Sequence, residues 1–378
     1  MRSSLSILLA LAMAGAVVGR PHLSSRQDAN PFEGRQLFVN PTYSEALEQT
    51  KSSFTQAGDT ENAGKVQFIQ DNVGSFVWVS NVASLGNIDA AIESARAAKQ
   101  AGQEQIVGLV LYDVPDRDCS AGESSGEFKV DEGGLERYKA EYIDPYAQKV
   151  MGATDLHFAI VLEPDAVANM ITGKDIPLCA NAAEPQRDAI AYAIQSLQSD
   201  HIHLYLDAAN SGWLSSQTSA GKLPISLLNR PLTKLTSPPL TPAATEFGTI
   251  VGKASNAQIR GFSINVSNYF PFQTESQYAD SLASALGGQG LPTRFIIDQG
   301  RVAPDRADTG EWCNVEGAGF GQPATTQTEN PNVDSIVWVK PGGESDGQCG
   351  MGGAPAAGAW FDAYAQMLTK NAHADIHA

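Results

Sequence analysis

Short apolar runs alternate with amphipathic stretches along the chain, and this alternation restricts the fold more than any other feature. Seven runs read as strands: residues 76–80, 106–113, 158–165, 203–207, 259–265, 295–298 and 336–340. Helix-like spacing of apolar residues occurs between or after them, at residues 88–101, 135–150, 186–197, 278–286 and 357–368. Strands that alternate with helices form parallel sheets, and near-continuous apolar strands are buried on both faces. We therefore predict an α/β fold with a barrel or barrel-like sheet of seven parallel strands.

Acidic residues gather where these apolar runs end. In a parallel barrel the carboxyl ends of the strands form the active face, so strand-end residues should carry the chemistry. The acids at the ends of runs are Asp113, Asp165, Asp207 and Asp298, and those on adjacent loops are Asp116, Asp118, Glu344 and Asp346. The sequence shows neither a Ser/His/Asp pattern nor metal-ligand spacing. We therefore expect carboxyl chemistry, of the kind in which two acids flank a glycosidic bond.

The segment Tyr112–Cys119 contains three aspartates and one arginine within six residues. Pro115 limits continuation of the preceding strand, so these charges should lie on a loop at its C-terminal end. Carboxylates this close together perturb one another's protonation, which general acid–base chemistry requires. The alternative is a solvated turn held by an Asp–Arg pair, and these eight residues alone leave both interpretations open.

Asp165 is the strongest candidate for a general acid. It ends the run Phe158–Asp165, whose apolar character predicts that the carboxyl group is partly removed from water. Burial raises a carboxyl pKa, and a neighbouring carboxylate raises it further. The alternative is that Asp165 caps the helix that follows.

The tryptophans divide by their context. Trp213 and Trp312 fall in loop-like stretches after strands, where an indole face could stack on the apolar face of a sugar ring. Trp338 and Trp360 lie inside a strand pattern and a helix pattern, which favours core packing for both.

Two polar motifs admit a functional and a structural interpretation. His201 and His203 alternate onto one strand face like a metal-binding pair, but no third ligand is near, so we expect no bound metal and no cofactor. Asn265-Val266-Ser267 is an N-glycosylation sequon at a strand end. Its position on the presumed active face favours Asn265 as a substrate contact over a sugar attachment site.

The N-terminal segment predicts export. Residues 1–19 carry an arginine near the start, an apolar centre and small residues at the end, as in a secretory signal peptide, and residues 20–30 resemble a short pro-segment or disordered N-terminus. Four cysteines without a C-x-x-C pair then indicate two disulfides, for which we expect neighbours along the chain to pair.

Charge and organisation narrow the function classes. The formal net charge of −17 disfavours binding to nucleic acid or to a membrane surface. Residues 31–378 contain no repeat and no tether to a second module, so we predict a single catalytic domain. Residues 215–246 interrupt the strand–helix rhythm and are rich in proline. They are either a surface insertion or an artefact of the gene model.

The motifs together resemble glycoside hydrolase family 6, the cellulases that cleave β-1,4-glucan with inversion. Tyr112–Cys119 is similar to the signature Y-D-[LV]-P-D-R-D-C, and Val161–Asn169 is similar to the family's second signature. Further matching motifs cover residues 205–208, 298–301, 312–314 and 338–344. The resemblance extends from about Asn30 to the C-terminus, is greatest to the fungal endoglucanases of the family, and implies a distorted, TIM-like α/β barrel.

The resemblance also implies a role for each matching residue. Asp165 would be the general acid, Asp118 would raise its pKa and relay a proton, and Tyr112 would press on the sugar at the cleavage point. Asp346 holds the position often assigned to the base. The implied substrate-binding residues are Trp78, Ser80, Asp207, Trp213, Asn265, Trp312, Lys340 and Glu344. The implied structural residues are Arg117, Arg301 and the disulfides Cys119–Cys179 and Cys313–Cys349.

The mode of attack follows from one loop. Residues 344–357 form a short, glycine-rich segment, whereas tunnel-forming members of the family carry a longer loop here. We therefore expect a monomeric endo-β-1,4-glucanase, with a cellobiohydrolase or a non-catalytic glucan-binding protein as alternatives. Two positions depart from the family pattern near the product-side sugars, namely Asn210 in place of a histidine and Ser216 in place of a second tryptophan.

Overall fold

A computed structural model describes residues 29–215, 240–255, 257–303 and 311–378 of the chain. The predicted signal peptide, nearly all of residues 20–30 and most of the predicted insertion therefore lie outside the described residues. The chain divides into two units, Met1–Asn30 and Pro31–Ala378, and the second contains all the helices and strands named below.

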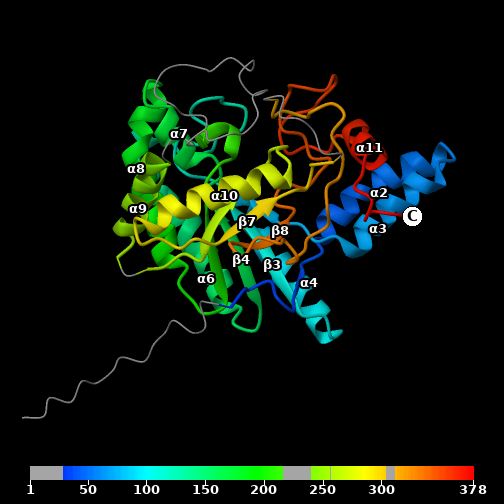
Figure 1. Ribbon diagram of the computed structural model, residues 1–378, viewed down its shortest axis with the longest axis horizontal. Helices are drawn as coiled ribbons and strands as arrows, with labels where there is room; N and C mark the ends of the chain where they lie inside the picture. Colours follow the sequence, from blue (N-terminus) through cyan, green and yellow to red (C-terminus); the bar gives the residue numbers. More distant parts are fainter. Residues whose placement is uncertain (1–28, 216–239, 256, 304–310) are drawn as a thin grey trace, which may run out of the picture. The chain divides into compact units, whose positions relative to one another are not determined.

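The second unit is built on a parallel sheet (Figure 1). The order of its strands is β1-β3-β4-β5-β6-β7-β8, and β2 also pairs with β3. The strands are β1 Gln36–Leu37, β2 Val77–Val79, β3 Gln105–Leu111, β4 His157–Leu162, β5 Ile202–Asp207, β6 Gly261–Ile264, β7 Phe295–Asp298 and β8 Val333–Val337. The two-residue β1 pairs with the start of β3 and β2 pairs with its end, so both occupy one side of β3.

The sheet curls into a nearly closed barrel of seven parallel strands, β2 to β8. Two hydrogen bonds span the remaining gap: Phe76 N–H donates to Trp338 O at 2.9 Å, and the Trp78 indole N–H donates to Val339 O at 2.8 Å. The predicted distorted seven-stranded barrel is confirmed. The sequence pattern missed β1, because two residues are too few to show a period.

The final strand begins and ends three residues earlier than predicted. Asp334 lies inside β8, where the Arg260 guanidinium pairs with it at 2.8 Å and the Tyr205 hydroxyl donates to it at 2.8 Å. Because the charge of Asp334 is paired inside the barrel, the strand can hold a charged residue next to its first residue, and a search for apolar runs misses its start. Lys340 lies beyond the strand. Its N–H donates to the Asp298 side chain at 3.0 Å and so makes no ladder bond to a neighbouring strand.

Helices surround the barrel, and all five predicted helical stretches are present with shifted ends. The helices are α2 Pro41–Gln56, α3 Thr60–Asn72, α4 Gly86–Gln100, α5 Gly134–Arg137, α6 Asp144–Gly152, α7 Ala166–Thr172, α8 Pro177–Ser196, α9 Thr241–Lys253, α10 Phe272–Gly287 and α11 Asp362–Lys370. A π-helical turn, Tyr138–Ile143, joins α5 to α6. Because α11 begins at Asp362, Trp360 precedes the helix and does not lie inside it as predicted.

Helix α9 corrects the boundary of the predicted insertion. Residues 241–246 form its first half, and Ala244, Phe247 and Ile250 bury their side chains against the barrel. No helix was predicted at residues 241–253, and its first turns fall inside the predicted insertion because Thr241 and Pro242 continue the composition of that segment. Residues 216–239 lie outside the described residues.

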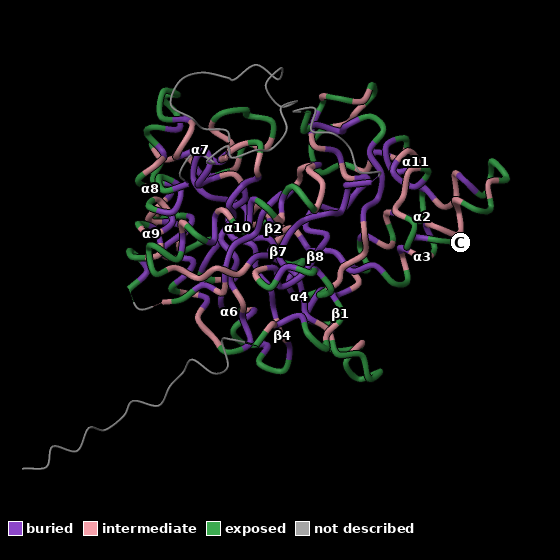
Figure 2. The backbone as a smooth tube through the Cα atoms, viewed as in Figure 1, coloured by how far each residue is buried: buried purple, intermediate pink, exposed green. Residues whose placement is uncertain are grey.

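Buried residues are concentrated in the strands and on the inner sides of the helices (Figure 2). They form three clusters. One fills the barrel, and a larger one lies between the strands and the surrounding helices. The third packs α2, α3 and α11 together, and Figure 1 shows these sequence-distant helices side by side at one end of the view. Within the described part of the chain, no helix is long and apolar enough to cross a membrane.

Candidate active site

The loop after β3 is held from inside the protein. Arg117 donates from Nε to Ser124 O at 2.7 Å and from Nη1 to Ser80 O at 2.8 Å, and its guanidinium lies 4.2 Å from the centre of the Tyr112 ring. Arg117 is 9% exposed and Asp113 is fully buried. The predicted Asp–Arg pair is present, with Arg117 Nη1 3.5 Å from Asp113 Oδ1, but the interpretation of Tyr112–Cys119 as a solvated turn is wrong because both side chains are buried.

Asp118 and Tyr112 meet at a serine that the sequence analysis missed. Asp118 Oδ2 accepts the Ser124 N–H at 2.8 Å and the Ser124 hydroxyl at 3.3 Å. The Tyr112 hydroxyl lies 3.0 Å from the same Ser124 hydroxyl oxygen. No pattern in the loop around Ser124 marks it, since only the folded loop brings it back to the strand end.

Asp165 follows β4 with its backbone in the left-handed region at φ 68°, a conformation that non-glycine residues adopt rarely. It occupies the N-cap position of α7, but its side chain makes no capping hydrogen bond. The alternative role of Asp165 as a helix cap is therefore wrong. Its backbone N–H donates to Asp207 Oδ2 at 3.0 Å. This bond fixes the turn through the backbone and does not involve the Asp165 carboxyl group.

The surroundings of Asp165 favour its protonated form. Burial raises the pKa of its carboxyl group well above the ordinary value, and the negative charges of Asp207 and Asp118 raise it further. The Asp165 charge in turn contributes to the raised pKa of Tyr112, after burial. The structure thus brings Tyr112, Asp118 and Asp165 together at the ends of two neighbouring strands.

Asp207 does not have the predicted contact with glucose. It is 1% exposed, and its Oδ2 accepts the N–H groups of Asp165 and Ala209 at 3.0 and 3.1 Å. Burial raises its pKa to about 7. Its observed role is to hold the backbone of Asp165.

Glu163 performs a similar task for the preceding strand, and the sequence analysis did not single it out. It is fully buried and accepts the N–H groups of Asp113 and Val114 at 3.0–3.1 Å. The Tyr138 hydroxyl in the π-helical turn donates to it at 2.7 Å. Glu163 therefore ties the end of β4 to the loop after β3, on which Asp118 lies.

Asn265 is also a supporting residue and not the predicted substrate contact. It is fully buried, and its Nδ2 donates to Phe270 O at 3.1 Å and to Asp298 O at 2.8 Å. A side chain bonded in this way can neither reach a glucose hydroxyl nor carry an N-linked sugar. Asn268, three residues further on, is only partly buried, and its Nδ2 donates to Val266 O at 2.9 Å.

Asp298 joins the ends of three strands. Its two carboxyl oxygens accept four backbone N–H groups at 3.0–3.1 Å, from Ser267, Gly300, Val339 and Lys340. It is 3% exposed, and burial raises its pKa. The carboxyl group of Asp298 is thus used to accept hydrogen bonds from the backbone.

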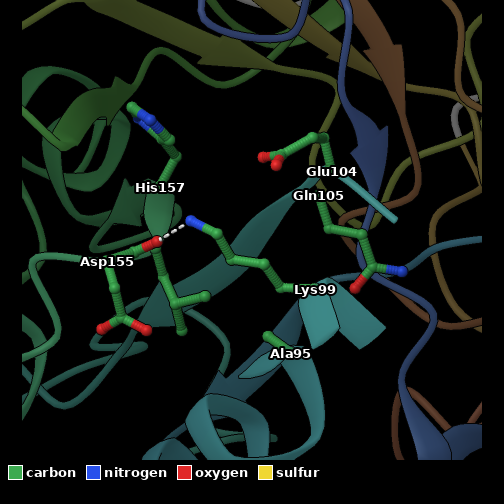
Figure 3. Close-up of a pocket in the computed structure, with 7 residues that line it drawn as sticks. Ala95, Lys99, Glu104, Gln105, Asp155 and His157 are labelled. Carbon is green, nitrogen blue, oxygen red and sulfur yellow. Dashed lines mark hydrogen bonds between the residues drawn. The ribbon is translucent and has the colours of Figure 1, made fainter. Parts of the chain in front are cut away.

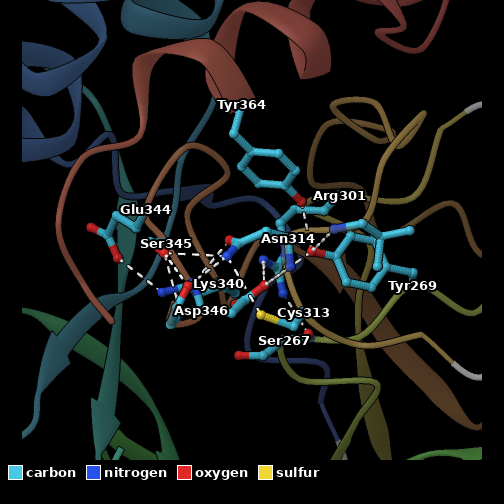
Figure 4. Close-up of polar contacts among 12 residues, drawn as sticks. Ser267, Tyr269, Arg301, Cys313, Asn314, Lys340, Glu344, Ser345, Asp346 and Tyr364 are labelled. Atoms are coloured by element: carbon cyan, nitrogen blue, oxygen red, sulfur yellow. Dashed lines mark hydrogen bonds and ion pairs between the residues drawn. The ribbon is translucent and has the colours of Figure 1, made fainter. Parts of the chain in front are cut away.

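Asp346 lies in a dense polar network (Figure 4). Its Oδ2 accepts from Arg301 Nη1 at 2.6 Å, from the Tyr269 hydroxyl at 3.1 Å and from the Asn314 N–H at 2.9 Å. Its own N–H donates to Asn314 Oδ1 at 2.9 Å. Among the described residues these three bonds all use Oδ2 and none uses Oδ1.

Trp78, Lys340 and Glu344 form one side of the site around Tyr112. The rings of Trp78 and Tyr112 pack edge to face with centroids 5.2 Å apart. Lys340 Nζ lies 5.6 Å from the Trp78 ring centroid and 3.3 Å from Glu344 Oε2. Trp78 and Glu344 are partly buried, so an indole face, an ammonium group and a carboxylate border the same space.

Trp213, Trp312 and Trp338 have the exposure predicted for them, although Trp338 lies just after β8 and not inside it. Trp312 is 45% exposed and borders a hollow of ≈ 450 Å³ that is also lined by Val315, Glu316 and Met351. Trp213 is half-buried, and its indole N–H donates to Thr172 Oγ1 at 3.0 Å. Trp338 is fully buried and stacks on Phe320, as core packing predicts.

Both disulfides are confirmed. Cys119–Cys179 attaches the residue next to Asp118 to helix α8, and Cys313–Cys349 joins the segments on either side of the Asp346 network. They brace the two loop regions in which the predicted catalytic carboxylates lie.

His157, His201 and His203 lie at the starts of β4 and β5, at the opposite end of the barrel. His201 contacts Val150 O at 3.1 Å, and His203 stacks on His157 with ring centroids 6.2 Å apart. Within the described ranges, no three His, Cys, Asp or Glu side chains are grouped so that they could hold a metal ion. A cavity at the start of β3 and β4 holds only about 10 Å³, enough for a single water (Figure 3).

Fold and site together define an α/β-barrel hydrolase that works with carboxyl groups. The sequence model of glycosyl hydrolases family 6 matches residues 32–372, and the chain belongs to this family. It is therefore a glycoside hydrolase of a family that inverts the anomeric centre.

Relatives of the chain carry both endo and exo names. Endoglucanase-6B of Humicola insolens is 56% identical, with 93% of this chain and 99% of that protein covered. A probable exoglucanase GH6D of Podospora anserina is 55% identical, with 100% and 85% covered. The structure of the endoglucanase CEL6B from Humicola insolens superposes with a TM-score of 0.83 at 56% identity and covers 92% of this chain and 100% of that one.

Proposed function

We propose that this protein is a secreted endo-β-1,4-glucanase that cleaves internal bonds of cellulose and its soluble derivatives with inversion. Membership of the family supports glycosidic cleavage, and relatives of nearly equal identity are named as endo- and exo-acting enzymes. Their names therefore do not choose between the two modes. The geometry of one loop supports the choice of endo action.

That loop follows Glu344 and folds back on its own base. Ser345 N–H donates to Ala359 O at 2.9 Å, Gly358 N–H donates to Ser345 O at 2.8 Å, and the Ser345 hydroxyl donates to Pro355 O at 2.9 Å. The Cys313–Cys349 disulfide holds its middle. A short loop closed in this way does not reach across a groove, which supports an open cleft that admits an internal glucan segment.

Asp165 is the proposed general acid. Its raised pKa keeps a proton available for the departing sugar oxygen, which is the requirement for an inverting acid. Tyr112 lies beside it and would press on the sugar at the cleavage point. Asp118, held by Ser124, would keep the Asp165 pKa high and accept a proton from the attacking water through solvent.

Asp346 is the other candidate for the base. The Arg301 guanidinium and two further donors all bind Oδ2, so Oδ1 is the oxygen that could face the attacking water. This arrangement supports an electrostatic role for Asp346 toward the positive charge that develops on the sugar ring.

The proposed substrate contacts are three indoles and three polar side chains. Trp78, Trp213 and Trp312 are the proposed sugar platforms, and each has an indole that is at least partly accessible. Lys340, Glu344 and Ser80 would bind hydroxyl groups at the cleavage point. Asp207 and Asn265 are no longer part of this set.

The proposal includes the setting of the enzyme. Residues 1–19 would direct secretion, residues 20–30 would be a short pro-segment, and the enzyme would act as a monomer without a cofactor. The net charge of −17 supports a neutral polysaccharide over nucleic acid or an anionic membrane surface.

Viscometry tests the endo mode. The loss of viscosity of a soluble cellulose derivative is plotted against the number of new reducing ends. We expect a steep early fall, because one internal cut halves a chain. A shallow fall with cellobiose as the main early product would support the second candidate, a cellobiohydrolase, which the relative named as an exoglucanase favours.

A further inference from the structure

Helix α7 connects the proposed acid to one of the proposed sugar platforms. Asp165 precedes its first residue, and Thr172 is its last. The Asn169 N–H donates to Asp165 O at 2.9 Å, so the first turn of the helix is built on the backbone of the acid. At about 1.5 Å per residue, the helix places Thr172 roughly 10 Å from Asp165 along its axis.

The side chain of Thr172 holds the Trp213 indole. The indole N–H donates to Thr172 Oγ1 at 3.0 Å. The Thr172 hydroxyl donates its single proton to Ala168 O at 2.9 Å, as threonine commonly does inside helices. With its proton used in this way, the hydroxyl oxygen can only accept, and the indole N–H is its partner.

The backbone of Trp213 is fixed by a separate set of contacts. Its N–H donates to Asn210 Oδ1 at 3.0 Å, and the Ser211 N–H donates to the fully buried Glu275 at 3.1 Å. Thr172 touches neither of these bonds. The Thr172 hydroxyl is thus a hydrogen-bond partner of the ring, which also packs against the cluster between the strands and helices, while Asn210 and Glu275 hold the backbone of the turn.

We propose that Thr172 is a positioning residue that sets the plane of the Trp213 indole relative to Asp165. This inference rests on the proposed function. A glucan chain whose sugar stacks on Trp213 is then held in register with the acid through one short helix. The relevant substrates are cello-oligosaccharides long enough to extend from Asp165 to Trp213.

A double-mutant cycle measures this coupling. Thr172→Val keeps the branched shape and removes the hydroxyl, Thr172→Ser keeps the hydroxyl, and Trp213→Ala removes the platform. Each is made in the Asp165→Asn background, and the Kd for cellohexaose is measured by calorimetry. We expect Thr172→Val to raise the Kd about 2- to 10-fold, the range of one hydrogen bond, and Thr172→Ser to restore it.

The cycle also gives the result that would overturn the inference. With Trp213→Ala present, Thr172→Val should leave the Kd unchanged; an equal loss in both backgrounds would mean that Thr172 acts through α7 and not through the indole. No loss in either background would overturn the inference as well. Because binding is measured without turnover, absence of glucanase activity in the wild type would sink only the proposed function.

The wild-type background adds a readout that a general folding defect would not produce. For Thr172→Val, we expect KM to rise more for cellohexaose than for cellotriose, because cellotriose can bind across the cleavage point in positions that leave Trp213 empty, whereas cellohexaose extends over it. An equal rise for both lengths would contradict a role in the register of the chain.

Discussion

At the scale of single residues, carboxyl groups at the strand ends divide into supports and candidates for chemistry. Asp207, Asp298 and Glu163 accept backbone N–H groups and hold the loops. Asp165 makes no capping bond with its own side chain. All four are acids at the end of an apolar run, so sequence position alone could not tell them apart; the difference lies in where each turn points its side chain.

The role of Asp165 predicts a large loss of rate on its removal. Asp165→Ala should lower kcat about 10²- to 10⁴-fold, because the leaving oxygen would depart without a proton donor. Binding of cello-oligosaccharides should persist, as measured by calorimetry. Activity close to that of the wild type would remove Asp165 from the acid role.

The charge of Asp118 predicts a shift in the pH profile. Asp118→Asn removes one of the negative charges that raise the Asp165 pKa, so that pKa should fall. Because the acid works only while protonated, the alkaline limb of kcat/KM should move to lower pH. Asp155→Asn, which removes a charge paired with Arg96 on the surface, is the control and should leave the limb in place. An unmoved limb in Asp118→Asn would contradict the coupling.

At the scale of elements, the sequence predicted strands better than it predicted the loops that unite them. Strands are visible because their apolar residues are continuous, as in Gln105–Leu111. Helices α2 and α3 were missed because each buries only a few side chains against the third cluster and exposes the rest. The contacts of Ser124 and Glu163 depend on loops that return from far along the chain, which no local pattern encodes.

The buried carboxyl group of Asp113, in the loop after β3, predicts that stability depends on pH. Burial raises the pKa of Asp113 to about 9 from an ordinary 3.8; the Arg117 guanidinium, 3.5 Å away, lowers this pKa, and Glu163 and Glu127 raise it further. As the pH rises above about 4, the unfolded chain loses this proton while the folded protein keeps it, so stability should fall up to about pH 9.

Asp113→Asn should remove this contribution. We expect the Tm of the variant to fall less than that of the wild type between pH 5 and pH 9, as measured by thermal unfolding. Asp131→Asn, at an exposed position, is the matched control for the loss of one charge. Parallel Tm curves for the wild type and Asp113→Asn would contradict the assignment of the buried proton.

At the scale of the whole folded unit, segments distant in the sequence close the barrel and support it. The Phe76 and Trp78 bonds to residues 338 and 339 bridge the gap between β2 and β8. The C-terminal segment packs on the α2–α3 pair, where Ile376 is 2% exposed and the ring centroids of His377 and Phe68 lie 4.8 Å apart. The alternation of strands and helices predicted the barrel, but this alternation did not predict the contact of the C-terminal segment with α2 and α3.

Ile376→Ala tests the contribution of this C-terminal contact to stability. Removing a buried isoleucine side chain should lower the free energy of unfolding by about 2–5 kcal/mol, as measured by denaturant titration. Ile176→Ala is the control, since Ile176 is 37% exposed and its truncation should cost far less. Equal costs for the two variants would mean that the C-terminal segment does not stabilise the fold.

The central claim is that Asp165 protonates the departing sugar while water attacks from the opposite face. NMR of cellohexaose during the first minutes of hydrolysis reports the configuration of each new reducing end before it mutarotates. We expect the α-anomer to appear first, because inversion converts the β-linkage into an α reducing end. Early accumulation of the β-anomer would contradict it.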